Sequence, residues 1–119
     1  MNFLRTSTFI ALLAGATLVN AACDTPAVPS APDGSTATLD EMIAGQQAVK
    51  AFQAEAQEYR ICLDEEMLIS KAAAGEGDSE AKEDYKAQTD AYNASVSAEE
   101  SVAGAFNSAI GAYKAANPK

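Results

Sequence analysis

Two cysteines, Cys23 and Cys62, are the residues of this chain with the clearest chemistry. They are the only thiols among 119 residues, and an even count in an exported chain is typical of a disulfide. A helix from Thr38 to Cys62 would be about 36 Å long, whereas residues 23–38 span about 46 Å as an extended polyproline II segment. The segment can therefore run back along the helix, and the sequence predicts a Cys23–Cys62 bond.

Cys23 has an alternative role as a lipid attachment site. Bacterial lipoproteins are cut before a cysteine that follows two small residues, with an apolar residue one position earlier. Ala21 and Ala22 match this pattern, but the next position holds Asn20, and the apolar Val19 lies one place too far. A lipid-anchored envelope protein modified at Cys23 stays open as the alternative to the disulfide.

Other residue types that usually carry catalysis are scarce. The sequence has no histidine, which removes the usual general base and the commonest metal ligand. Acids cluster at 64–66 and 99–100, but no Glu-x-x-His pattern of carboxylate metal bundles occurs. We interpret these acids as a solvated face, with a weak carboxylate-based cation site as the lesser alternative. The sequence predicts no enzyme, no catalytic residue, no metal site and no cofactor.

Residues 1–21 predict a cleaved signal peptide. Arg5 supplies a positive start, residues 9–19 are apolar but too short to cross a bilayer, and Val19-Asn20-Ala21 fits a small-residue cleavage site. Removal of Arg5 leaves 7 Lys+Arg against 17 Asp+Glu, a net charge of −10. This charge argues against nucleic acid and anionic membranes as partners. The sequence predicts a periplasmic or secreted protein cut after Ala21, with no membrane contact unless Cys23 carries lipid.

Two long helices, at about 39–73 and 79–116, must position these residues. Thr38 and Glu41 form a capping-box pattern before the first, glycines at 75 and 77 end it, and Asp78 caps the second. Ser97 begins a second capping-box pattern, so a break there is an alternative, although the unbroken heptad phase favours one continuous helix. A turn near Gly75–Glu76 would make the two helices antiparallel, with Leu63 near Thr89.

Heptad spacing predicts the seam, by which we mean the stripe of side chains between the two helices. In the first helix the predicted positions are 42, 49, 56, 63 and 70 together with 45, 52, 59 and 66. In the second they are 85, 92, 99, 106 and 113 together with 89, 96, 103 and 110, and Val102 widens the stripe. Phe52 is one of the largest members and is expected near Glu100 and Ala103.

Residues 22–37 form a proline-rich arm before the helices. Pro26, Pro29 and Pro32 are three residues apart, which is the period of polyproline II, so their rings would form one ridge. The arm is either a stiff linker or a third layer laid on the helices, and the spacing leaves both open.

Several short segments of this chain resemble those of a known group of proteins. They are 33–38 (DGSTAT), 49–52 (VKAF), 59–64 (YRICLD), 92–94 (YNA) and 105–107 (AFN). They resemble a group of short, alanine-rich exported (periplasmic) proteins of Gram-negative bacteria. The resemblance covers most of the chain after residue 21 and implies export and a helical build, and it carries over no catalytic residue.

Together these features predict an all-α fold, an antiparallel two-helix hairpin over 38–119 with an extended arm. Two helices expose more apolar seam than they bury, so self-association or an unknown protein partner would complete a bundle. We expect an interaction or structural protein of the envelope.

Overall fold

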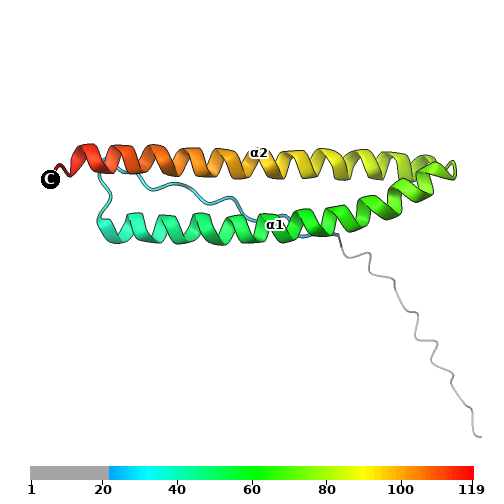
Figure 1. Cartoon of the computed structure of the whole chain (residues 1–119), viewed down its shortest axis with the longest axis horizontal. Coiled ribbons are helices and arrows are strands. Elements are labelled where there is room, and N and C mark those ends of the chain that lie inside the picture. The colour runs from blue at the N-terminus through cyan, green and yellow to red at the C-terminus, as the bar shows by residue number, and fades with distance from the viewer. Residues whose placement is uncertain (1–21) are drawn as a thin grey trace, which may run out of the picture.

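The computed structural model describes residues 22–119, and the predicted signal peptide lies outside the described residues. Two helices, α1 (Leu39–Gly75) and α2 (Ser79–Ala116), run antiparallel and pack along their length (Figure 1). The described residues form the predicted all-α hairpin. Each helix is about 56 Å long at 1.5 Å per residue.

Both helices begin where the sequence predicts. The Thr38 hydroxyl accepts the backbone N–H of Glu41 at 3.2 Å, and a Glu41 carboxylate oxygen accepts the Thr38 N–H at 2.7 Å, so the capping box is complete. The Asp78 carboxylate accepts the N–H groups of Glu80 and Ala81. The second helix continues through Ser97 without a break, because no residue there interrupts its heptad phase.

The turn between the helices lies slightly later than predicted. Gly75 is the last residue of α1, and Gly77 takes the left-handed conformation with φ +99°. The N–H groups of Gly77 and Asp78 bond to the carbonyls of Ala74 and Ala73, which closes the end of α1 as in a Schellman motif. The Thr89 hydroxyl accordingly lies 3.5 Å from the sulfur of Met67, one turn beyond the predicted neighbour Leu63.

The seam of α1 is confirmed position by position. All nine predicted residues are buried or half-buried, and Phe52 keeps only 3 % of its surface exposed. In the second row predicted for α2, positions 89, 103 and 110 are half-buried, but Val96 is 37 % exposed. The most buried row of α2 is Ala81, Ser95, Val102 and Ala109, with Gln88 half-buried between them, and of these residues only Val102 was predicted.

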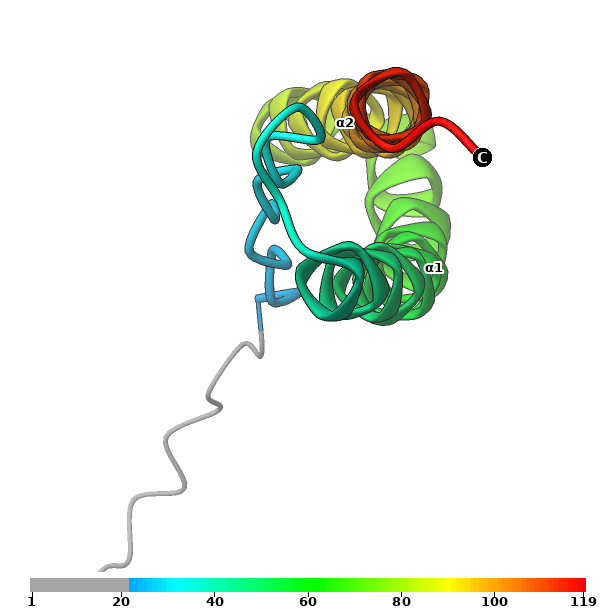
Figure 2. The same cartoon turned by 90° about the vertical axis from the view of Figure 1, so that its left-hand side faces the viewer.

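The arm packs against this buried row over part of the length of α2. It runs back from the start of α1 along one side of the hairpin and bridges the two helices as a third layer (Figures 1 and 2). Among residues 22–33, only Cys23, Pro26, Pro29 and Pro32 are half-buried and all the others are exposed. This period of three confirms the predicted proline ridge and decides for a third layer.

The arm reaches α2 at a tight turn. The Asp33 carboxylate accepts the N–H of Ser35 at 3.0 Å and its hydroxyl at 2.6 Å, and the Asp33 carbonyl accepts the N–H groups of Thr36 and Ala37. Gly34 is buried against α2. A Cβ on Gly34 would overlap the carbonyl oxygen of Ala109 and come within 2.8 Å of the Tyr113 nitrogen, so only glycine permits this approach.

Candidate functional site

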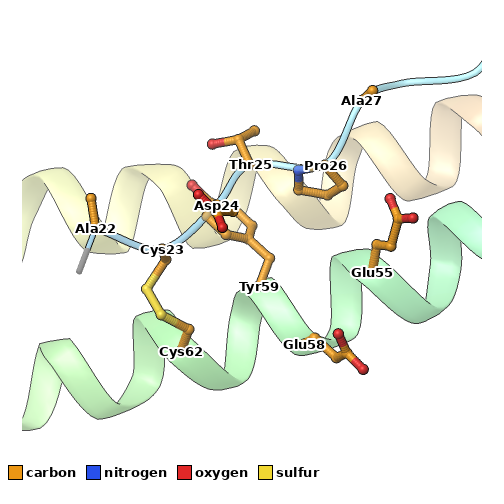
Figure 3. A pocket seen from close by; sticks show the side chains of 10 residues that line it. All are labelled: Ala22, Cys23, Asp24, Thr25, Pro26, Ala27, Glu55, Glu58, Tyr59 and Cys62. Atoms are coloured by element: carbon orange, nitrogen blue, oxygen red, sulfur yellow. A yellow bond between two sulfur atoms is a disulfide. The ribbon is translucent and has the colours of Figure 1, made fainter.

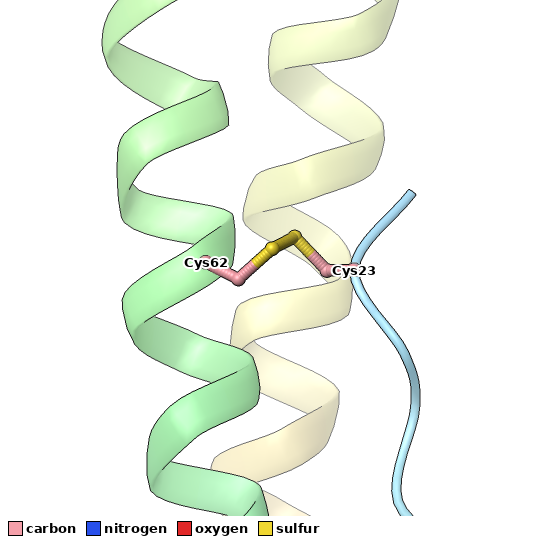
Figure 4. Close-up of a disulfide and its surroundings, with 2 residues drawn as sticks. All are labelled: Cys23 and Cys62. Carbon is pink, nitrogen blue, oxygen red and sulfur yellow. A yellow bond between two sulfur atoms is a disulfide. The ribbon is translucent and has the colours of Figure 1, made fainter. Parts of the chain in front are cut away.

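The predicted bond between Cys23 and Cys62 is present in the structure. Their Cα atoms are 5.8 Å apart, and the bond joins residues 39 positions apart in sequence. Cys23 comes from the arm and Cys62 from the middle of α1, with α2 behind them (Figure 4). Both residues are half-buried. The disulfide therefore fixes the first residues of the arm to the hairpin.

The alternative that Cys23 carries a lipid stays a prediction. It would use the same sulfur atom as the disulfide. A thioether to a lipid uses the Cys23 sulfur, which in this structure is bonded to Cys62. One molecule can carry only one of the two modifications.

A shallow hollow of about 560 Å³ lies beside the disulfide. The arm forms one wall, and α1 forms the other with Glu55, Glu58 and Tyr59 (Figure 3). Asp24 adds a third carboxylate from the arm. With no lysine or arginine in its lining, the hollow has a negative potential that attracts cations and repels anions.

A second hollow, of about 330 Å³, lies beneath the arm. Phe52 and Tyr59 of α1 face small side chains of α2 across it, and Thr25, Pro26 and Val28 cover it. The residues from α2 are Ala91, Ala94, Ser95 and Ala98. The arm thus shields an apolar part of the seam from water.

A single ion pair links the two helices within residues 22–119. Arg60 lies 2.8 Å from a carboxylate oxygen of Glu99 and also donates to the Ser95 hydroxyl at 3.2 Å. The Arg60 and Glu99 side chains are only 17 % and 28 % exposed. The expectation of a solvated acid is therefore wrong for Glu99, since its heptad position turns it toward α1. The sequence analysis did not predict that Arg60 pairs with Glu99. The available signal was that Glu99 is a predicted seam position, which turns its carboxylate toward α1.

The other members of the predicted acid clusters are not brought together as a site. Asp64, Glu65 and Glu100 are exposed, whereas Glu66 is half-buried in the seam near Cys62. Hydrogen bonds from the Ser35 hydroxyl and then from the Ser35 N–H hold the pKa of the Asp33 carboxyl below its usual value. The same hydrogen bonds stabilise the turn before α1, and the lowered pKa does not indicate a reactive group.

No protein-family model, curated protein or solved structure matches this chain. Function is therefore inferred from the residues of this chain alone. The resemblance to alanine-rich exported proteins stays a prediction.

Proposed function

We propose that this chain is a small exported helical protein that acts by binding another protein or a second copy of itself, and not as an enzyme. The observation that carries the proposal is a group of three large aliphatic side chains exposed on the outer face of α1, with the exposed Glu65 between them. Ile61, Leu68 and Ile69 are 52 %, 71 % and 72 % exposed. Their spacing of i, i+7 and i+8 places them on one side of the helix, away from the seam residues Leu63 and Ser70.

This outer face has no structural role within the described hairpin. Large aliphatic side chains gain about 1.5–3 kcal/mol each when they are removed from water, and grouped exposed apolar residues are typical of interaction surfaces. An apolar helix face from a second hairpin is the simplest complement, because two hairpins make a four-helix bundle.

Export is supported by the disulfide. Such bonds persist in oxidising compartments and are rare in the cytosol. Among residues 22–119, no helix has a stretch apolar enough to cross a membrane. We propose a periplasmic or secreted location after cleavage behind Ala21.

The lipid-anchored alternative rests on Ala21 and Ala22 before Cys23. Intact mass of the exported chain separates the two forms: a disulfide removes two protons, whereas lipidation adds a diacylglycerol. Detection of a lipid adduct would mean that the protein is tethered to the membrane and is not a free periplasmic protein.

The test of binding is a paired photo-crosslinking and sedimentation experiment. A photoreactive residue at position 68 is compared with one at position 28, since Val28 is also exposed, at 62 %, but belongs to the arm. We expect an adduct of defined mass from position 68 only, and Leu68→Ser with Ile69→Ser should abolish any dimer found by sedimentation. A monomer that gives no adduct at position 68 in envelope extract would contradict the proposal.

A further inference from the structure

One cluster of three metal-ligating side chains occurs within residues 22–119. The sulfurs of Cys23 and Cys62 and a carboxylate oxygen of Glu66 all lie within 4.8 Å of one another. Cys62 and Glu66 are one helical turn apart on α1, so both face the arm side of the helix. All three residues are half-buried.

Glu66 has no evident structural partner in this part of the chain. The two ion pairs among the described residues, Arg60–Glu99 and Lys86–Asp90, do not include it. The hollow beside it contains Asp84, Ser70 and Gln88 but no lysine or arginine.

We propose that the dithiol form of this protein binds one Zn²⁺ through Cys23, Cys62 and Glu66, with water as the fourth ligand. A dithiol supplies two electrons and two protons and becomes a disulfide, or a phosphine supplies two electrons and becomes its oxide with the oxygen of water, whose two protons pass to the sulfurs. In either case the S–S bond breaks and two thiols form. Zn²⁺ then binds both sulfurs as thiolates and releases two protons. Neighbouring ligand atoms of a tetrahedral zinc site are about 3–4 Å apart. The two sulfurs must therefore move apart once their bond is broken, whereas a Glu66 carboxylate oxygen already lies within 4.8 Å of both.

The ligand types and the surrounding charge select the metal. Two thiolates favour zinc over calcium or magnesium, which prefer all-oxygen sites. Asp24, Glu55 and Glu58 line the hollow next to Cys23 and Cys62 and raise the local concentration of cations. The metal would hold the arm on α1 when the disulfide is open, so the arm of the reduced protein is fixed only while zinc is bound. This proposal is independent of the outer face of α1.

The test is zinc titration of the mature chain after reduction with a phosphine, which does not itself offer a thiol. Native mass spectrometry should show one Zn²⁺ per reduced chain and none on the disulfide form. Cobalt in place of zinc should give a sulfur-to-metal charge-transfer band. Glu66→Gln should weaken binding at least about tenfold, and Cys23→Ser should abolish the stoichiometric complex.

The matched control is Glu65→Gln, because Glu65 is the exposed neighbour of Glu66 and should leave the affinity unchanged. In the reduced protein, bound zinc should also protect the arm from proteolysis, and a chelator should remove that protection. The proposal is overturned if the reduced chain takes up no zinc, if the disulfide form binds equally well, or if Glu65→Gln and Glu66→Gln have equal effects.

Discussion

Gly34 is the residue that lets the arm approach α2 closely just before α1 begins. Its Cα lies against the backbone of α2, and a methyl group there would collide with Ala109. Backbone atoms cannot rotate away as a side chain can, so the arm itself must move. We expect Gly34→Ala to destabilise the protein by roughly 1–3 kcal/mol, the usual cost of overpacking, in urea unfolding followed by circular dichroism.

Gly111→Ala is the matched control for this substitution. Gly111 lies in α2 between Ala109 and Tyr113, the two residues that Gly34 approaches, but a Cβ on Gly111 meets nothing within 4 Å. It lies inside a helix, where alanine is favoured by up to about 1 kcal/mol over glycine. The two substitutions should therefore have opposite signs, and a Gly34→Ala protein as stable as Gly111→Ala would show that the arm is not seated on α2.

Asp33 is expected to make the turn before α1 sensitive to acid. The Ser35 hydroxyl, followed by the Ser35 N–H, lowers the pKa of Asp33 in the folded protein. The bonded carboxylate therefore stabilises the fold at pH values above the unfolded pKa, and this contribution is lost as the pH falls through the folded pKa. Ser35→Ala keeps the backbone donor but removes the hydroxyl, so the pKa of Asp33 should rise.

The measurement for Asp33 is an NMR titration of its carboxyl carbon. Ser30→Ala serves as the control, because Ser30 is an exposed arm serine outside the Asp33 turn and should leave the pKa of Asp33 unchanged. If the pKa of Asp33 is the same in the Ser35→Ala and Ser30→Ala proteins, the hydrogen bond from the Ser35 hydroxyl at 2.6 Å is not what lowers the pKa of Asp33.

The arm, as an element, is held mainly by its disulfide. The bond closes a loop of 39 residues, for which the chain-entropy model gives about 4 kcal/mol. In a domain of this size that corresponds to a fall of about 20 °C in melting temperature on reduction. Limited proteolysis should then begin within residues 27–35, where most arm side chains are already exposed.

A Cys23→Ser, Cys62→Ser variant separates the bond from other effects of the reductant. It should melt at the temperature of the reduced protein and should not respond to a phosphine. Equal melting temperatures for the oxidised and reduced native chains would mean that the prolines and Gly34 alone hold the arm.

Most elements of this fold were predictable because their signals are local in sequence. The Thr38–Glu41 capping box, the Asp78 cap and the proline period each depend on a few adjacent residues, and all are confirmed. The Cys23–Cys62 pairing was predictable since the chain has only two cysteines.

Features that depend on three layers together were not predictable. The burial of Ser95 was not predicted, because Ser95 lies beneath the arm residues Thr25, Pro26 and Val28, and the sequence does not say which side of the seam the arm takes. For the same reason Gly34 gave no signal, since its role depends on Ala109, which is 75 positions away in sequence. The pairing of Arg60 with Glu99 depends on the helix register, which the turn at Gly77 determines.

The whole molecule is divided between a three-layer end and a two-layer end. Met42, Phe106 and Ala109 form the main buried cluster near the start of α1, together with Val49, Ile110 and others. The arm lies over this half (Figure 1), and its Cys23 is bonded to Cys62 of α1. Beyond it, the buried positions hold the small residues Ser70 and Ala81, and the Gln88 amide oxygen is buried without a hydrogen-bond donor among the described residues.

The two-layer end should therefore open first. Small side chains bury little apolar area, so local unfolding of residues 66–88 costs less free energy than global unfolding. In native-state hydrogen exchange, amides of 66–88 should exchange at least tenfold faster than amides of 45–56 and 99–109. Ser70→Ala offers a further check. It nearly keeps the size of this buried residue but removes a hydroxyl that is costly to bury. It should therefore slow amide exchange in residues 66–88 alone. Uniform protection along both helices would mean that the hairpin unfolds as one unit and that the third layer adds no local stability.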